Sequence, residues 1–290
     1  MTDKPRHRSG YTSEETELVR SACLTVAVTL GAYLDDVVIV GGLVPSLLVD
    51  TQRAEPGEVD ATHPGTNDLD LGLSLAVLDD QRYTEISARL RAEHFKPDEN
   101  AAGNPTVQQW RSGDLKVDFL MPPAPGQDTN RRVQNLEPDF GALVTRGLEL
   151  AFNECVKVPI VGKTLSGEEA TRDVPVCGPG AFTVLKALAF ADRSEPKDAF
   201  DLIYLIRGTE DGSVAVAEKL KEHAASHREV VDDAVAFLAR DFETPTHIGP
   251  RRAAAFDYID GDDLDAAAAD AHGYVDDLLD AYRGDRPPRS

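Results

Sequence analysis

Apolar residues recur along the chain with spacings that predict its helices. A four-residue spacing between Thr12 and Tyr33 predicts a helix with one buried face. The apolar residues that set this spacing are Leu18, Ala22, Val26, Leu30 and Leu34. Further helices are predicted at residues 43–49 and 79–94. Beyond Gly180 the period stays helical, and helices are predicted at 182–191, 197–207, 214–224, 229–239 and 264–282.

Strands are predicted where the apolar period is two or where β-branched residues form a short run. Residues 37–40 form such a run. From Asp68 to Leu75, acidic or small residues alternate with leucine, which is typical of a strand with one buried face. The other predicted strands are 107–111 and 115–120, which form a hairpin, and 148–152, 156–161 and 173–176. Residues 50–66 and 126–137 are polar and are predicted to be connections.

These elements predict an α+β fold, with a mixed sheet and flanking helices followed by a helical C-terminal domain. The α/β domain is expected at residues 12–178 and the helical domain at 179–284. Polar residues 1–11 and 285–290 are expected to be disordered tails.

Composition adds an unusual charge to this picture. Among 290 residues, 51 acids oppose 30 bases, which gives a formal net charge of −21. Such an excess opposes non-specific attraction to nucleic acids and to anionic membranes. Two explanations stay open: the acidity is a compositional habit of a salt-adapted or high-GC organism, or it serves the function.

The cysteines and the apolar stretches indicate the cellular compartment in which the protein is expected. Cys23, Cys155 and Cys177 are odd in number and far apart, which argues against a disulfide framework and a thiolate zinc site, so we expect buried apolar roles. No apolar stretch of about 18 residues and no signal-peptide pattern is apparent, so we expect a cytoplasmic protein without a membrane partner.

Two aspartates on one predicted strand are the strongest chemical feature. Asp68 and Asp70 lie two residues apart, so their side chains share one face, with Cα atoms roughly 7 Å apart. Two ionised carboxylates at this spacing repel each other, and cations between them relieve the repulsion. Asp118 on a second strand would supply a third oxygen ligand. This set favours Mg²⁺ (or Mn²⁺) and two-metal phosphoryl chemistry.

A glycine pair supplies a complementary feature. Gly41-Gly42 follows the predicted strand at 37–40, and glycine lets the backbone turn sharply and approach a ligand closely. Backbone N–H groups at the start of the next helix would then face phosphates.

In this order, the motifs resemble those of the nucleotidyltransferase superfamily. The matching segments are Val38-Ile39-Val40-Gly41-Gly42, Thr66-Asn67-Asp68-Leu69-Asp70-Leu71 and Lys116-Val117-Asp118-Phe119. The resemblance implies a nucleotidyltransferase-like sheet that moves a nucleoside monophosphate from an NTP substrate. It also implies that Gly41, Gly42 and Thr66 contact the nucleotide and that Asp68, Asp70 and Asp118 bind metal and catalyse the transfer.

The helical half of the sequence indicates which group within this superfamily the chain resembles. An apolar helix carries Lys186, and the segment Arg193-Ser194-Glu195-Pro196-Lys197-Asp198-Ala199-Phe200-Asp201-Leu202 follows it. This resembles AbiEii-like toxins of toxin–antitoxin systems, which include the MenT group. The resemblance implies that Lys186 binds the triphosphate and takes part in catalysis, and that Lys197 and Asp201 complete the pocket. It further implies an acceptor RNA, such as tRNA, and a cognate antitoxin protein as partners.

Other interpretations stay open. The same chemistry could serve a small-molecule acceptor of the aminoglycoside type, which suits the acidic charge, or the fold could bind nucleotide without catalysis. Asp118 could form a surface ion pair with Lys116 or Arg111, and Lys186 could extend to solvent. His63 could contact substrate or lie solvated in a loop. Trp110, the only tryptophan, is expected in the core.

Overall fold

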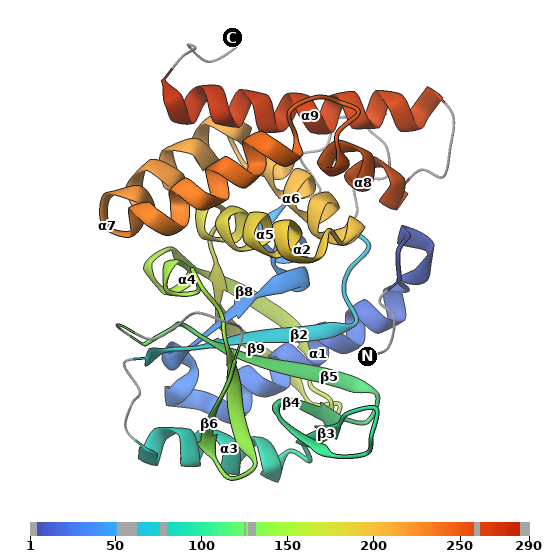
Figure 1. The fold of residues 1–290 in the computed structure, drawn as a ribbon. Helices are drawn as coiled ribbons and strands as arrows, with labels where there is room; N and C mark the ends of the chain where they lie inside the picture. Colours follow the sequence, from blue (N-terminus) through green and yellow to red (C-terminus); the bar gives the residue numbers. More distant parts are fainter. Residues whose placement is uncertain are drawn as a thin grey trace. The chain divides into compact units, whose positions relative to one another are not determined.

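The chain folds into two compact units, which are described one at a time. The computed structural model describes residues 5–50, 63–75, 80–124, 126, 132–257 and 262–284 (Figure 1). The sheet unit comprises Tyr11–Val44 and Pro64–Cys177. The helical unit comprises the described parts of Lys4–Gly10, Pro45–His63 and Gly178–Ser290. The division after Cys177 lies one residue before the predicted boundary, but the helical unit also takes in two N-terminal segments.

In the described residues of the sheet unit, nine strands form one mixed sheet in the order β3-β4-β5-β2-β1-β9-β8, with β7 paired to β5 and β6. The strands are β1 (Val37–Val40), β2 (Asp68–Leu73), β3 (Lys96–Glu99), β4 (Pro105–Ser112), β5 (Leu115–Met121), β6 (Val133–Glu137), β7 (Phe140–Val144), β8 (Cys155–Lys163) and β9 (Glu169–Cys177). The mixed α+β class predicted from the sequence is therefore confirmed.

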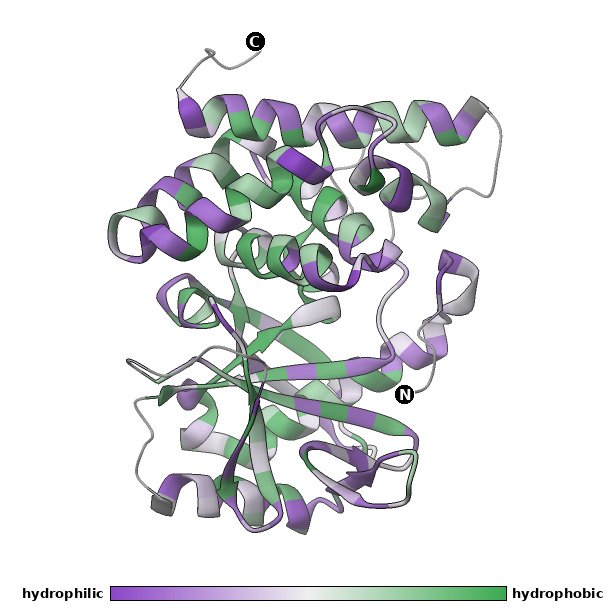
Figure 2. Ribbon diagram, viewed as in Figure 1, coloured by the Kyte–Doolittle hydropathy of each residue, from purple (hydrophilic) through white to green (hydrophobic). Residues whose placement is uncertain are grey.

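Three adjacent strands at the middle of the sheet carry the motifs. Strand β1 runs antiparallel to β2, and β2 runs parallel to β5. The alternating pattern of β2 and β5 places one face in the core and leaves the other half-exposed. Figure 2 shows this alternation as purple and green bands along both strands. The buried side chains on these two strands are Leu69, Leu71, Val117 and Phe119.

Helix α1 (Ser13–Leu30) packs against β8 and β9. Thr12 and Glu15 form a capping box, because each side chain bonds the backbone N–H of the other residue. Val19, rather than the predicted Leu18, lies on the buried face, and Leu18 is 40% exposed. The other helices of this unit are α3 (Asp80–Ala92) and α4 (Glu149–Asn153).

One stretch of the described residues, Ser13–Asp36, is long and apolar enough to cross a membrane. This corrects the expectation that no stretch would reach that length. Half of its apolar window is buried inside the structure, and the core helix of a soluble protein meets the same test. The contacts of α1 with β8 and β9 agree with such a core role.

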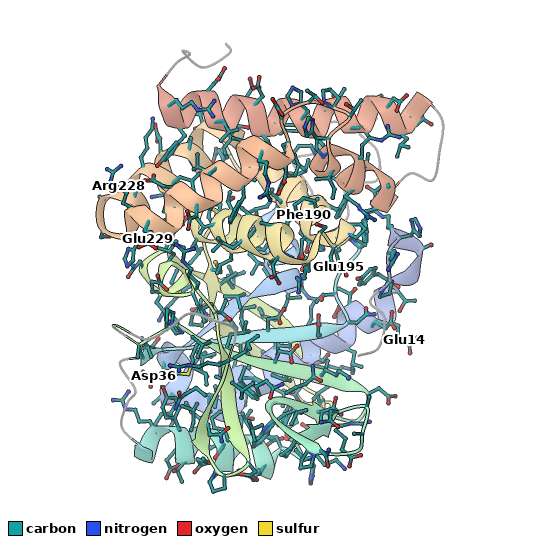
Figure 3. The ribbon with its side chains drawn as sticks, in the orientation of Figure 1. Glu14, Asp36, Phe190, Glu195, Arg228 and Glu229 are labelled. Atoms are coloured by element: carbon teal, nitrogen blue, oxygen red, sulfur yellow. The ribbon has the colours of Figure 1, made fainter. Side chains whose placement is uncertain are left out.

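The helical unit contains five longer helices in its described residues. They are α5 (Pro179–Arg193), α6 (Pro196–Gly208), α7 (Gly212–Asp241), α8 (Ile248–Asp257) and α9 (Asp262–Arg283). Helix α7 packs against α5 and α9, while α8 packs against α6 and α9. Phe190, labelled in Figure 3, is buried on α5 with its ring 5.9 Å from that of Phe242. The two helices predicted at 214–224 and 229–239 form α7, whose backbone is non-helical at His227.

Several predicted elements differ in the structure. The strand predicted at residues 148–152 is wrong, because α4 lies there and buries Leu150 and Ala151, which are adjacent and cannot share one face of a strand. Strands β3, β6 and β7 and helix α8 were not predicted. Most residues of β6 are polar, and its exposed positions are Val133 and Asn135, so its sequence lacks the apolar alternation of a half-buried strand.

The predicted N-terminal tail does not hold for its described part. Arg8–Gly10 forms a 3-10 helix, and Arg8 pairs with Asp257 at 3.0 Å. The tail at 285–290 and most of the connection at 50–66 lie outside the described residues. A short helix, α2 (Val44–Leu48), follows the glycine pair as predicted.

Candidate active site

Three aspartates meet on one face of the sheet unit, and we call them the aspartate face: Asp68, Asp70 and Asp118. Asp70 and Asp118 are register partners on the parallel strands β2 and β5. Adjacent strands lie about 4.8 Å apart, and register partners share a face. Asp68 lies two residues along β2 on that same face. All three aspartates are half-buried.

Gly41 lies directly against this face. Its backbone has φ +69°, and a Cβ added there would lie 1.8 Å from Oδ2 of Asp70. Any other side chain would therefore collide with the carboxylate, in addition to the strain of the left-handed conformation. Gly42 is buried in the 3-10 helix Gly41–Leu43, and the N–H of Val44 donates to the carbonyl oxygen of Gly41. The close approach expected of the glycine pair occurs here toward Asp70.

Two neutral donors orient the outer carboxylates. The hydroxyl of Thr66, which is buried, donates to Oδ1 of Asp68 at 2.9 Å. The side-chain amide of Gln109 donates to Oδ1 of Asp118 at 2.7 Å. Gln109 was missed from the sequence, although it is the register partner of Asp118 in the predicted β4–β5 hairpin. A count across the hairpin turn would have found it.

Lys116 and Arg111, which were considered as ion-pair partners of Asp118, form ion pairs with Asp98 instead. Lys116 pairs with Asp98 at 2.9 Å, and Arg111 approaches Asp98 at 3.7 Å. Asp98 is only 3% exposed. Burial alone would raise the pKa of Asp98, but hydrogen bonds and the charges of Lys116 and Arg111 hold it below its usual value.

The aspartate face has the donor chemistry of a Mg²⁺ or Mn²⁺ site. Its ligands are hard carboxylate oxygens, half-exposed, on neighbouring strands and beside a glycine that leaves room. Among the described ranges, no group of three or more His, Cys, Asp or Glu side chains is gathered as an assembled metal cage would be. The types of residue fit the metal, and the oxygen positions in this structure do not form a closed cage.

A second cluster lies within the helical unit, and we call it the buried charge network. Its members are His63, Lys186, Arg193, Lys197, Asp198 and Asp201. Lys186 on α5 is at its centre, and Nζ donates to Asp198 at 2.8 Å and to Asp201 at 2.7 Å. Lys186 is 7% exposed, and the two aspartates are 2% and 0% exposed. The alternative that Lys186 extends to solvent is wrong.

Two more cations pair with the same aspartates from more open positions. Arg193, at the end of α5, binds Asp198 through Nε at 2.5 Å and a terminal nitrogen at 2.8 Å. Lys197 donates to the two oxygens of Asp201 at 2.7 and 3.0 Å. Glu195, labelled in Figure 3, precedes α6 between these two cations in sequence. The aspartates are therefore ion-paired on both sides, and Asp198 is more than a first-turn acid of α6.

The charges in the network explain its pKa shifts. Burial alone would raise the pKa of Asp198, but Lys186 and Arg193 lower it to about 2. Burial acts against ionisation of Asp201 as well, yet Lys186 and Lys197 hold its pKa far below the usual value. Burial alone would lower the pKa of Lys186, and the two carboxylates instead raise it. All three groups stay charged at neutral pH, so attraction compensates for their burial.

His63 belongs to this network. It is 6% exposed, and Nε2 lies 2.9 Å from Oδ1 of Asp201. Its ring meets the edge of Tyr204 at 4.9 Å between centroids. Burial, followed by the nearby charge of Lys197, lowers the pKa of His63 to about 4, so the ring is neutral at pH 7. The interpretation of His63 as a solvated loop residue is wrong.

The structure thus gathers the predicted site residues into two sets. Gly41, Thr66 and the three aspartates lie together in the sheet unit. Lys186, Lys197 and Asp201 lie together in the helical unit, joined by residues that the sequence did not single out for this role. Trp110 is fully buried as expected, with its ring 5.3 Å from that of Phe140.

In comparisons with known proteins, no family model and no curated protein sequence matched the chain.

Proposed function

We propose that this chain is a metal-dependent nucleotidyltransferase that moves a nucleoside monophosphate from an NTP to an acceptor. The observation that supports the proposal most is the register of Asp70 with Asp118, with Asp68 on the same face and Gly41 against Asp70. Three half-buried carboxylates on one face are expensive to keep together without a cationic ligand. Phosphoryl transfer needs such a ligand to neutralise the triphosphate.

Each residue of the aspartate face has a role in the proposal. Asp70 and Asp118 would face the reacting phosphate, because they are adjacent across β2 and β5. Asp68 would complete the set, held in place by the hydroxyl of Thr66. Gly41 leaves open the volume that the carboxylate of Asp70 occupies. Gln109 fixes the rotamer of Asp118 through the hydrogen bond to its Oδ1.

Asp68, Asp70 and Asp118 are the residues that would hold Mg²⁺ or Mn²⁺. When bound, the metal would neutralise phosphate charge and increase the acidity of the attacking hydroxyl. The side chains would hold the nucleotide in line for attack, and positioning accounts for most of the catalysis in this class of reaction.

We further propose that Lys186, Lys197 and Asp201 contribute to nucleotide binding. Lys186 already uses two N–H donors on Asp198 and Asp201, which leaves one for a phosphate. Lys197 donates to both oxygens of Asp201, and its positive charge would add to that of Lys186. A macromolecular acceptor such as tRNA, and a role as the toxin of a toxin–antitoxin pair with an antitoxin partner, complete this proposal.

The assay combines purified chain, Mg²⁺, each labelled NTP and total tRNA. The test variant is Asp70→Asn, which keeps the size of the side chain and removes its charge. The matched control is Asp114→Asn, since Asp114 is fully exposed in the turn between β4 and β5. We expect label in tRNA with the wild type and the control and at least about 100-fold less with Asp70→Asn. Equal labelling by both variants would refute the site.

The acidic charge supports one alternative acceptor. A net charge of −21 attracts a polycationic small molecule and repels RNA at long range. The same assay therefore includes an aminoglycoside as acceptor. Label on the aminoglycoside and none on tRNA would favour an antibiotic-modifying enzyme. Mg²⁺-dependent NTP binding without transfer to any acceptor would favour a non-catalytic nucleotide-binding module.

A further inference from the structure

Two cysteines that lie far apart in the sequence are directly opposite each other in the sheet. Cys155 is the first residue of β8 and Cys177 is the last residue of β9, and they are register partners in this antiparallel pair. Register partners in antiparallel strands have Cα atoms about 4.5–5.5 Å apart and side chains on one face. A disulfide needs a Cα separation of about 4.4–6.8 Å, so this pair meets the requirement.

The two thiols differ in access. Cys155 is exposed, whereas Cys177 is fully buried. Both are in the thiol form in this structure. A small disulfide can therefore reach Cys155 first and form a mixed disulfide with it. Cys177, the register partner of Cys155, lies where its thiol can attack that mixed disulfide. Cys23, the remaining cysteine, is buried on α1 and serves as an internal reference.

We propose that Cys155 and Cys177 form a reversible cross-strand disulfide when the chain meets a small-molecule disulfide. The expectation that all three cysteines are buried is wrong for Cys155, which is exposed. The proposal does not depend on nucleotidyl transfer, because it concerns another edge of the sheet.

The chemistry takes two exchange steps. The Cys155 thiolate attacks one sulfur of the oxidant, whose S–S bond breaks and releases one small thiolate, which takes up a proton. The Cys177 thiol loses its proton to solvent, attacks the sulfur of Cys155 and expels the second small thiolate. In total, the protein loses two hydrogens and the small disulfide becomes two thiols.

The place of the pair in the chain gives the link a structural effect. Cys177 is the last residue of the sheet unit, directly before Gly178 and α5. Its neighbour Val176 is the register partner of Ile39, two residues before Gly41. A bond from Cys155 would therefore fix the end of β9 beside the strand that leads into the glycine pair. The link closes the whole β8–β9 hairpin.

We expect thiol–disulfide exchange at this pair to be slow, so the test uses a long equilibration. Burial raises the pKa of Cys155, and it raises the pKa of Cys177 well above its usual value. The native full chain is therefore equilibrated overnight in mixtures of reduced and oxidised glutathione at about pH 8, close to the ordinary pKa of a thiol. Acid quench, alkylation in denaturant and mass spectrometry of the digest then identify the linked peptides.

We expect a linked Cys155–Cys177 peptide at the oxidised end, and an intact chain lighter by two hydrogens. Cys23→Ser should retain the link, and Cys155→Ser should abolish it. The linked chain should melt on the order of 5 °C higher, and dithiothreitol should reverse the shift. A stable glutathione adduct on Cys155, or three alkylated cysteines at the oxidised end, would overturn the proposal. The linked peptide, the mass change and the shift in melting temperature are read on the wild type, so they stand even if a cysteine variant fails to fold.

Discussion

The aspartate face and the buried charge network both collect carboxylates, but they hold them differently. In the network, Asp198 and Asp201 are sealed from solvent and ion-paired to Lys186, with Arg193 and Lys197 adding further pairs. On the aspartate face, the carboxylates are half-exposed and receive hydrogen bonds from a hydroxyl and an amide. The ion pairs of the network compensate for the burial of its charges, whereas the carboxylates of the aspartate face stay half-exposed.

The difference separates two kinds of charged site. A sealed network holds the fold together, and removing one member leaves another charge stranded in the interior. An open, oriented set costs little to alter in stability but offers oxygen atoms to a metal. Substitutions in the network should thus act first on folding, and substitutions on the aspartate face should act first on ligand binding.

The largest expected effect is on stability, from Lys186→Met. This change keeps most of the side-chain volume and leaves two buried carboxylates without their central cation. The free energy of unfolding should fall by about 3–5 kcal/mol, measured by urea denaturation. Lys219→Met is the control, since Lys219 forms a surface pair with Glu222 and should change stability by less than about 1 kcal/mol. If Lys186→Met and Lys219→Met lowered the free energy of unfolding equally, the claim that the buried charge network stabilises the fold would be contradicted.

The second prediction concerns pH. His63 has a pKa of about 4 when folded, below the 6.5 of an ordinary histidine, so the unfolded chain binds its proton first as pH falls. The contribution to stability is complete above pH 6.5 and is lost as the pH falls toward 4. Between pH 7 and pH 5, the wild type should lose about 2 kcal/mol more than His63→Gln. Parallel pH profiles for the two proteins would contradict this.

The third prediction compares two glycines whose φ angles are both positive and similar. Gly41 has φ +69° and Gly113 has φ +60°, but nothing lies within 4 Å of a Cβ built at Gly113. Both alanine variants carry the strain of a left-handed backbone, and only Gly41→Ala also meets the carboxylate of Asp70. Gly41→Ala should unfold about 1–2 kcal/mol more easily than Gly113→Ala. Identical thermal midpoints would mean that Asp70 can move aside without cost.

The smallest effect is expected from Gln109→Leu, which removes the donor to Asp118. Under the proposed function, NMP transfer should fall by about 5-fold, or about 1 kcal/mol, with stability little changed. Gln108→Leu is the control, because Gln108 is the neighbouring residue on β4 and points to the opposite face. A loss of transfer in both variants would point to damage of the hairpin instead.

Local pattern predicted the elements that carry the aspartate face. The run at residues 37–40, the alternation at Asp68–Leu71 and the β4–β5 hairpin each follow from neighbours in sequence, and the structure places them as expected. Which of these strands pair with one another depends on the topology of the sheet and could not be predicted from local sequence. The contact of Gly41 with Asp70 depends on β1 and β2 lying side by side, which no local pattern specifies.

The residues that the sequence missed depend on contacts between distant segments. His63 was interpreted as a solvated loop residue because its neighbours are polar, yet Asp201, 138 positions later, buries it. The opposition of Cys155 and Cys177 likewise needs the register of β8 with β9. Lys197 and Asp201 are one helical turn apart, so that pair could be predicted.

Calorimetric titration of NTP, with and without Mg²⁺, tests the central claim most directly. We predict that the wild type and Asp114→Asn bind NTP only when Mg²⁺ is present. Asp70→Asn should remain folded, with a thermal midpoint no lower than that of the wild type, and should lose this Mg²⁺-dependent binding. Binding of equal strength to folded Asp70→Asn and wild type would contradict the assignment of the aspartate face as the metal–nucleotide site.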